Sequence, residues 1–388
     1  MRGKNTFRSW AEQVSILKGK TVSKQALWKR VSAALTQFLL AILFDILGEQ
    51  SSSIHEQAKR QSSLKSYKRV LLQDRTAIAL PDCLNWCFPG NVSKGKKKAQ
   101  LKIQVIYDLL SNRFIHFEIT SYAANDQSKS KDILSIAAGE DLVIRDLGYF
   151  VLNCLDEMVV RNISFISRLR FGVKIYSIAT GQEINLSKVL RKEGKFDQWV
   201  LIGRDQKLKV RLVILQLPQE QANLRRKRAK ENRDKRLNHN AAYYEMLEYN
   251  LFITTEEETV FTAKQIAQLY GWRWRIESIF KCWKSHFNLQ KIIPQNGSLT
   301  KERAEAIVYM MLIFILLLQV TTYHYVLLAT EKIENCCISL MKLCKYIAGN
   351  IELFLTDSLT SIMPKILYYC CYDKRCDRKT FVQKIKLG

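Results

Sequence analysis

The sequence predicts an α/β fold: a mixed sheet with helices on its faces, flanked by helical regions at both ends of the chain. Residues 67–149 predict the sheet, because their pattern runs strand, hairpin, helix, strand. The residues before and after this stretch predict the helices, because their apolar side chains recur at spacings of three and four. A chain of 388 residues is long enough for two or three domains and a sizeable core.

The charge of the chain points to a polyanionic partner. Lys and Arg number 61 against 36 Asp and Glu, which leaves a formal net charge of +25. Such an excess costs self-repulsion and is most simply explained by a polyanionic partner. Hydrophobic residues make up 47% of the sequence, a share that argues against disorder.

The ten cysteines do not form a disulfide framework in so long a chain. The pairs Cys336–Cys337 and Cys370–Cys371 fit no metal-ligand spacing, so we expect reduced thiols in a cytoplasmic protein. The first residues, MRGKNTFRSWAEQ, lead into polar sequence rather than the apolar core of a signal peptide, which favours the same location.

One apolar run, residues 306–320, approaches the length of a membrane span when it is extended to residue 328. Thr, Gln and His interrupt its second half, and we therefore expect a core helix and no membrane partner. The alternative is a membrane-associated protein whose positive charge faces anionic lipid.

Residues 1–65 are predicted to be helical. A short helix ending at Gly19 precedes a longer one that Ser23 caps, with Lys24, Lys29 and Arg30 on its outer face. The pair is compatible with a helix-turn-helix that reads DNA. A plain helical bundle explains the same pattern, and both interpretations stay open.

Residues 66–154 are predicted to form the first part of the core. One strand runs into Asp74, two strands meet at a turn around Ser111 and Asn112, and a very apolar strand leads to Asp146. An isolated aspartate at the end of a strand is usually a turn or cap residue. Further residues are therefore needed to assign either aspartate a function.

Residues 155–260 alternate like antiparallel strands and predict a mostly β insertion that includes one basic helix. That helix lies in NLRRKRAKENRDKRLN, where Arg225, Arg226 and Arg228 are candidates for contacts with phosphates. A solvated helix is the alternative. Residues 261–330 are predicted to complete the core and residues 331–388 to form a C-terminal helical region.

The stretch YGWRWRIESIFKCWK, residues 270–284, is predicted to be one helix with a polar stripe. At 100° per residue, Tyr270, Arg273, Glu277 and Lys284 fall within an arc of roughly 60°. The opposite face is apolar and would dock on the core; it carries Trp272, Ile276, Ile279 and Trp283.

Glu277 gives the two aspartates a chemical context. Three carboxylates that converge on one point repel one another unless divalent metal neutralises them, and oxygen ligands suit Mg²⁺. Two such ions about 4 Å apart can activate a nucleophile and stabilise the leaving oxygen in phosphodiester cleavage. Arg273 and Lys284 would then hold neighbouring phosphates, and Tyr270 would bond a phosphate or stack on a base.

These residues resemble a known family. Tyr270, Arg273, Glu277 and Lys284 match the Y-(2)-R-(3)-E-(6)-K signature of the insertion-sequence-four family of transposases, which are DDE enzymes with a ribonuclease-H-like core. LLQDRTAIALP and VIRDLGYF resemble the first and second acidic motifs of that family. The sequence departs from the motifs at Arg75, where a small residue is usual, and at Leu147, where a basic residue is common.

The resemblance implies Asp74, Asp146 and Glu277 as the catalytic, metal-binding triad, with two Mg²⁺ ions that Mn²⁺ can replace. It also implies a mostly β insertion in the ribonuclease-H-like core at residues 155–260, and an aromatic residue there that stacks on a flipped base. Trp199 is our candidate for that residue, with a core tryptophan as the alternative.

The function that the resemblance implies is DNA transposition. The protein would hydrolyse one strand at each end of its own insertion sequence and join the freed 3'-hydroxyl to double-stranded target DNA, acting as a homodimer on paired ends. The alternative is a catalytically inactive or domesticated relative that only binds DNA, through the N-terminal helices and the basic runs.

Overall fold

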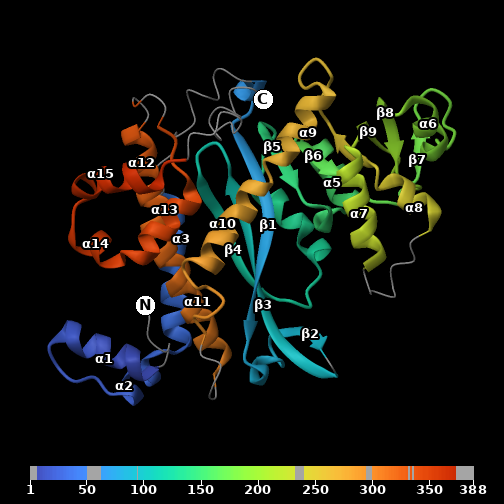
Figure 1. The fold of residues 1–388 in the computed structure, drawn as a ribbon. Coiled ribbons are helices and arrows are strands. Elements are labelled where there is room, and N and C mark those ends of the chain that lie inside the picture. Colours follow the sequence, from blue (N-terminus) through green and yellow to red (C-terminus); the bar gives the residue numbers. More distant parts are fainter. Residues whose placement is uncertain are drawn as a thin grey trace. The chain divides into compact units, whose positions relative to one another are not determined.

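A computed structural model describes residues 7–49, 63–93, 95–231, 240–293, 299–330, 333 and 336–372. The chain divides into two compact units, which Figure 1 draws as one ribbon and which are described here in turn. Unit 1 comprises Met1–Glu56, Asp74–Asn125 and Arg275–Val382; unit 2 comprises Gln57–Gln73, Asp126–Trp274 and Gln383–Gly388. Strand β1 (Arg69–Leu80) and helix α10 (Trp274–Ser285) each contribute residues to both units.

The sheet has the predicted mixed character. Its strands follow the order β2-β3-β1-β5-β6-β10-β9-β8-β7, and β4 pairs with β3. Within this order, β5 is parallel to β1 and β6 is parallel to β5, whereas β4 is antiparallel to β3. The strands are β2 (Pro89–Ser93), β3 (Lys96–Asp108), β4 (Arg113–Ser121), β5 (Asp141–Arg145), β6 (Ser164–Arg168), β7 (Ile175–Ser177), β8 (Phe196–Ile202), β9 (Leu208–Gln216) and β10 (Tyr249–Thr254).

In unit 2 the parallel strands are buried on both faces. Strand β5 reads DLVIR and is buried at every position, as expected for a parallel strand covered on both sides. Strands β10, β9, β8 and β7 continue this sheet with antiparallel pairing. The helical elements of the unit are η1 (Ser63–Ser66), η3 (Asp126–Ser135), η4 (Leu147–Tyr149), α5 (Leu152–Val160), α6 (Leu186–Glu193), α7 (Gln219–Glu231), α8 (Ala241–Met246) and α9 (Ala263–Gly271).

In unit 1 the hairpin of β3 and β4 turns where the sequence predicts it. Asn112 adopts a positive φ of 58°, a conformation that asparagine tolerates in tight turns. Helix α10 packs on this hairpin, with the ring of Trp283 5.4 Å from that of Phe114 and 6.0 Å from that of Phe117. The other helical elements are η2 (Asp82–Leu84), α11 (Lys301–Ile315), the π-helical turn η5 (Leu316–Val320), α12 (Thr321–Thr330), α13 (Leu340–Gly349), α14 (Ile351–Thr356) and α15 (Leu359–Cys370).

The N-terminal helices begin and end largely as predicted. Helix α1 (Phe7–Lys18) stops at Gly19, whose φ is +60°, and Ser23 caps α2 (Lys24–Arg30) by accepting a hydrogen bond from the backbone N–H of Ala26. The predicted single long helix is wrong, because it breaks at Val31 into α2 and α3 (Ala33–Glu49) with a bend of 66°. The break buries Val31 in unit 1, a gain that the helical pattern alone does not reveal.

Residues Lys301–Thr330 form a continuous helix that is long and apolar enough to cross a membrane. Its most apolar window is 61% buried inside the protein, which is the behaviour of the core helix that the sequence favours. The bent pair α2 and α3 passes the same length and composition test when it is taken as one span.

Candidate active site

Asp74 lies within strand β1. The prediction that the strand ends at Asp74 is wrong, because β1 continues to Leu80 with Thr76, Ile78 and Leu80 all buried on alternate positions. Burial of these side chains extends the strand beyond the acidic residue. The carboxylate of Asp74 is half-buried and accepts a hydrogen bond of 2.8 Å from the backbone N–H of Arg75.

Two basic side chains lie close to Asp74 within unit 1. Burial and the charge of Arg75 hold the pKa of Lys284 below its ordinary value, and Asp74 opposes this shift. Arg75, the residue that departs from the family motif, directs its guanidinium over the ring of Tyr122 at 5.7 Å. Lys284 therefore lies close enough to Asp74 and Arg75 to feel the charge of both.

The segment with the Y-R-E-K signature folds as two helices, and the prediction of a single helix is wrong. Helix α9 ends at Gly271, and α10 begins at Trp274. Glycine is a poor helix former, and the tryptophans on either side of Arg273 require different surroundings: Trp272 is buried, while Trp274 is exposed. Tyr270 consequently lies on α9, whereas Glu277 and Lys284 lie on α10.

Helix α10 docks on unit 1 through the apolar face that the sequence predicts, with Ile276, Ile279 and Trp283 buried. Two polar contacts add to this packing. The indole N–H of Trp283 donates to Oε1 of Gln319 at 3.0 Å, and Nη2 of Arg275 donates to the hydroxyl of Tyr323 at 2.8 Å. These contacts fix the rotation of α10 and leave Glu277 and Lys284 half-buried.

Asp146 follows β5 directly and caps the short helix η4. Its Oδ2 accepts a hydrogen bond from the backbone N–H of Gly148 at 3.3 Å, and its Oδ1 lies 3.7 Å from Nε of Arg273. A Cβ atom at Gly148 would stand 3.5 Å from Oδ2 of Asp126 and 3.6 Å from Oδ2 of Asp146. The glycine therefore leaves open space beside the two carboxylates.

Tyr270 is 8% exposed and packs its ring on Phe252 at 5.2 Å. Burial raises the pKa of Tyr270 to about 12, with Asp146 adding to the shift and the arginines Arg273 and Arg168 opposing it. The hydroxyl therefore stays protonated and available as a donor. Among the described residues, it makes no hydrogen bond within the usual distance and angle limits.

Arg168 is a basic residue near this site that sequence reasoning missed. It lies on β6, cross-strand from Phe252, and acts electrostatically on both Tyr270 and Arg225. The available signal was an arginine at the end of the strand SFISR.

The basic helix α7 is formed, and its arginines differ in their contacts. Arg225 donates to the carbonyl of Tyr249 at 3.1 Å and to Oδ1 of Asn250 at 2.7 Å, while Arg226 forms an ion pair with Glu248. Arg228 is exposed. The remainder of the predicted basic run, residues 232–238, lies outside the described residues. Two of the three predicted phosphate ligands thus already contact protein.

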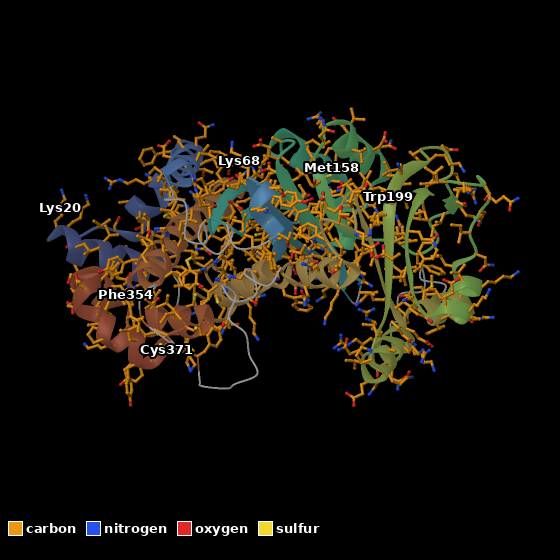
Figure 2. The ribbon with its side chains drawn as sticks, turned by 90° about the horizontal axis from the view of Figure 1, so that it is seen from above. Lys20, Lys68, Met158, Trp199, Phe354 and Cys371 are labelled. Carbon is orange, nitrogen blue, oxygen red and sulfur yellow. The ribbon has the colours of Figure 1, made fainter. Side chains whose placement is uncertain are left out.

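Trp199 lies on β8 in the insertion, where Figure 2 labels it. Its side chain is half-buried, and Nζ of Lys209 stands 5.3 Å from the ring centroid. Its cross-strand partner on β9 is Arg211. The tryptophan is thus neither a fully buried core residue nor a freely exposed one.

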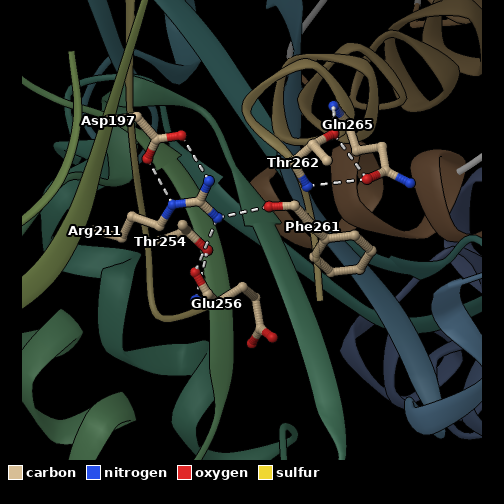
Figure 3. A network of polar contacts seen from close by, with 7 residues as sticks. All are labelled: Asp197, Arg211, Thr254, Glu256, Phe261, Thr262 and Gln265. Carbon is tan, nitrogen blue, oxygen red and sulfur yellow. Dashed lines mark hydrogen bonds and ion pairs between the residues drawn. The ribbon is translucent and has the colours of Figure 1, made fainter. Parts of the chain in front are cut away.

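Arg211 joins the insertion to the start of α9 (Figure 3). The fully buried guanidinium binds both carboxylate oxygens of Asp197 at 2.7 Å, and its Nη1 donates to the carbonyls of Phe261 at 2.6 Å and Glu256 at 3.3 Å. Directly after Phe261, Thr262 forms a capping box with Gln265 at the N-terminus of α9. This network therefore anchors the helix that carries Tyr270.

The three predicted metal ligands come from both units: Asp74 and Glu277 from unit 1, and Asp146 from unit 2. Their assembly into one site stays a prediction. Within the described ranges, no group of three or more His, Cys, Asp or Glu side chains is arranged to hold a metal ion. The donors themselves fit Mg²⁺, because each is a half-buried carboxylate, and Gly148 leaves space beside Asp146.

The chain matches the family model of the transposase DDE domain over residues 65–317. It is 29% identical over 339 residues to the transposase for insertion sequence element IS231D of Bacillus thuringiensis subsp. finitimus, covering 82% of this chain and 70% of that protein. It is 26% identical over 303 residues to the transposase for insertion sequence element IS1151 of Clostridium perfringens, covering 73% and 63%. A piggyBac transposase synaptic complex with hairpin DNA aligns with a TM-score of 0.38 and 9% identity, covering 81% of this chain and 59% of that one.

Strand β1 carries Asp74, and Asp146 directly follows β5, the parallel neighbour of β1. The chain belongs to the transposase DDE-domain family and is a DDE transposase of the insertion-sequence-four type. It is accordingly an enzyme that binds DNA and catalyses strand cleavage and strand transfer, in a family that generally uses divalent metal ions.

Proposed function

We propose that this transposase cleaves the ends of its own insertion sequence and joins the 3'-hydroxyl to target DNA, with Asp74, Asp146 and Glu277 as its metal-binding carboxylates. The observation that carries the proposal is that each aspartate lies beside a cation within its own unit: Asp74 beside Lys284, and Asp146 beside Arg273. Phosphodiester cleavage requires carboxylates to bind the metal ions and cationic side chains nearby to bind the phosphates.

The preferred ions are two Mg²⁺, which Mn²⁺ can replace. When bound, they would supply Lewis acidity to the scissile phosphate and a deprotonated nucleophile. Water would first hydrolyse a phosphodiester bond to free a 3'-hydroxyl. That hydroxyl would then attack a phosphate of the target and displace the 3'-oxygen of the neighbouring target nucleotide, so that no covalent protein intermediate forms.

The basic and aromatic residues would hold the DNA. Arg273, Lys284 and Arg168 would bind phosphates near the cleaved bond, and the protonated hydroxyl of Tyr270 would donate to one of them. Trp199 would stack on a flipped base at the end of the element. From α7, Arg228 would contact phosphates directly, whereas Arg225 and Arg226 would do so by exchanging their protein partners.

The proposed organisation has five parts: a helical DNA-binding region at 1–65, the core in 66–154 and 261–330, the insertion at 155–260, and a helical region at 331–388. The protein would act in the cytoplasm as a homodimer on two paired ends. The final residues, 373–388, lie outside the described part of the chain.

A cleavage assay tests the assignment. Purified protein is incubated with Mg²⁺ and a labelled duplex that carries the inverted repeats flanking the gene. Asp74→Asn, Asp146→Asn and Glu277→Gln should each abolish cleavage and preserve end binding, while Glu193→Gln on the exposed surface should cleave normally. Strand cleavage that persists in any of the three variants contradicts the triad. Binding without cleavage by the unmutated protein would instead favour a DNA-binding relative without chemistry.

A further inference from the structure

Each aspartate of the proposed site follows a buried polar residue. Gln73, directly before Asp74, is 3% exposed, and Arg145, directly before Asp146, is 1% exposed. The two are the last register partners of the paired strands β1 and β5, and Arg145 also ends β5. Since successive residues of extended backbone face opposite ways, Gln73 and Arg145 lie on the reverse face of the sheet from the aspartates.

Both side chains bond to consecutive residues of one segment, η3. Nε2 of Gln73 donates to the carbonyl of Lys129 at 3.0 Å. Nη1 of Arg145 donates to the carbonyl of Ser130 at 2.9 Å and to its Oγ at 3.0 Å. One short stretch of backbone therefore binds both strands at the positions directly before the two aspartates.

Ser130 extends this arrangement past Asp146. Its side chain is fully buried, and its hydroxyl donates to the carbonyl of Tyr149 at 2.8 Å. Tyr149 belongs to η4, the helix that Asp146 caps. The segment around Asp146 is thus held on both sides, by Arg145 before it and Tyr149 after it. We name the side chains of Gln73, Ser130 and Arg145 the Ser130 clamp.

The charge of Arg145 is not explained by an ion pair. Its hydrogen-bond acceptors among the described residues are Ser130 and the sulfur of Cys154, all uncharged, and its Nη2 has no partner there. Burying a guanidinium without a carboxylate is costly, and an apolar residue would complete the core at lower cost. This favours a role for Arg145 in the site rather than in stability alone.

We propose that Gln73, Ser130 and Arg145 are positioning residues, which fix β1 and β5 at the positions directly before Asp74 and Asp146 and thereby the placement of these two residues before metal binds. The clamp rests on the proposed function, because it acts through those two carboxylates. It contacts neither DNA nor metal itself. Residues that orient metal ligands from behind commonly alter metal affinity or activity about 10–100-fold when they are changed.

The test uses Ser130→Ala and Arg145→Lys in the full-length protein. Matched controls are Ser135→Ala, whose exposed hydroxyl bonds Asp132 in the same segment, and Arg161→Lys, whose guanidinium bonds Leu134 there. Mn²⁺ binding is measured by calorimetry without DNA, beside cleavage rate, end binding and thermal midpoint. Both clamp variants should bind Mn²⁺ and cleave about 10–100-fold more weakly, with end binding unchanged, while the controls match the unmutated protein.

Clamp variants that bind Mn²⁺ and cleave like their controls would overturn the proposal. If Arg145→Lys unfolds, Ser130→Ala decides, because it removes only a hydroxyl. Asp146→Asn in the same titration separates the two proposals. If Asp146→Asn loses Mn²⁺ binding and Ser130→Ala keeps it, only the proposal of the clamp is contradicted. Unchanged Mn²⁺ binding in Asp146→Asn means that the metal site itself is misassigned, and the proposal of the clamp is then contradicted as well.

Discussion

Arg211 and Arg145 of unit 2 are both fully buried, and their surroundings differ. Arg211, 2% exposed, has a bidentate partner in Asp197 and two backbone carbonyls, so its charge and most of its donors are satisfied. Arg145, equally buried, has only uncharged partners among the residues that the structure describes. A hydrogen-bond network that satisfies a buried charge stabilises the folded state, whereas a buried charge without a counter-charge destabilises it. The first arrangement therefore indicates an anchor, and the second indicates a functional constraint.

The position of each arginine fits this distinction. Arg211 joins β9 to the residue before α9, where a firm attachment holds the helix that carries Tyr270 (Figure 3). Arg145 stands directly before Asp146 on the last position of β5. Loss of Arg211 should thus be felt mainly in folding, and loss of Arg145 mainly in the reaction.

The largest expected effect on stability is that of Arg211→Met. Removing the guanidinium leaves Asp197 and the carbonyl of Phe261 without their partner, which for a buried pair costs about 3–5 kcal/mol. We expect the lower end, about 3 kcal/mol, because the side chain of Asp197 is 26% exposed and water can solvate it. Urea denaturation followed by tryptophan fluorescence measures the change. A loss below about 1 kcal/mol would remove the basis for treating Arg211 as an anchor.

Arg145→Met should cost less stability than Arg211→Met. No ion pair is broken, and the lost hydrogen bonds to Ser130 are worth about 1–2 kcal/mol together. The same denaturation experiment compares the two variants directly. If Arg145→Met proved the more destabilising, the division between anchor and functional constraint would be reversed.

Thr262→Ala should have a smaller effect in the Arg211 network. The hydroxyl of Thr262 accepts a hydrogen bond from the backbone N–H of Gln265 at the start of α9, and loss of such a cap costs about 1 kcal/mol. Thr262→Ser keeps the hydroxyl and serves as the control. Equal stability of the Ala and Ser variants would show that α9 is held by Arg211 and packing alone.

The smallest effect concerns alkaline pH. Burial and the carboxylate of Glu256 raise the pKa of Tyr67 well above its ordinary value of about 10. Because the native state keeps this proton while the unfolded chain releases it, the contribution of Tyr67 is fully present below about pH 10 and is lost as pH rises further. Tyr67→Phe should therefore lose less stability between pH 9 and pH 11 than the unmutated protein. Tyr368→Phe, at an exposed position, should show no such difference in the same urea titrations.

Sequence reasoning succeeded where the pattern is local. The alternation around β3 and β4 predicted the hairpin and its turn at Asn112, and the apolar face of α10 was read correctly from the spacing of Ile276, Ile279 and Trp283. It failed where tertiary packing overrides periodicity. The helical pattern runs through Gly271 and Val31, yet a helix ends beside each of them. Burial of neighbouring residues stabilises the fold more than an uninterrupted helix would.

The sequence by itself determined the family, the mixed sheet with its flanking helices, and the identity of the acidic and basic residues proposed for catalysis, because fixed spacings and alternation are properties of the chain alone. Only the tertiary structure decided which buried polar residues support them. Gln73 and Arg145 are 72 positions apart and meet through strand pairing, and the consecutive residues Lys129 and Ser130 of a separate segment accept a hydrogen bond from one each. Contacts of this kind depend on which strands become neighbours, and no local pattern in the sequence encodes that choice.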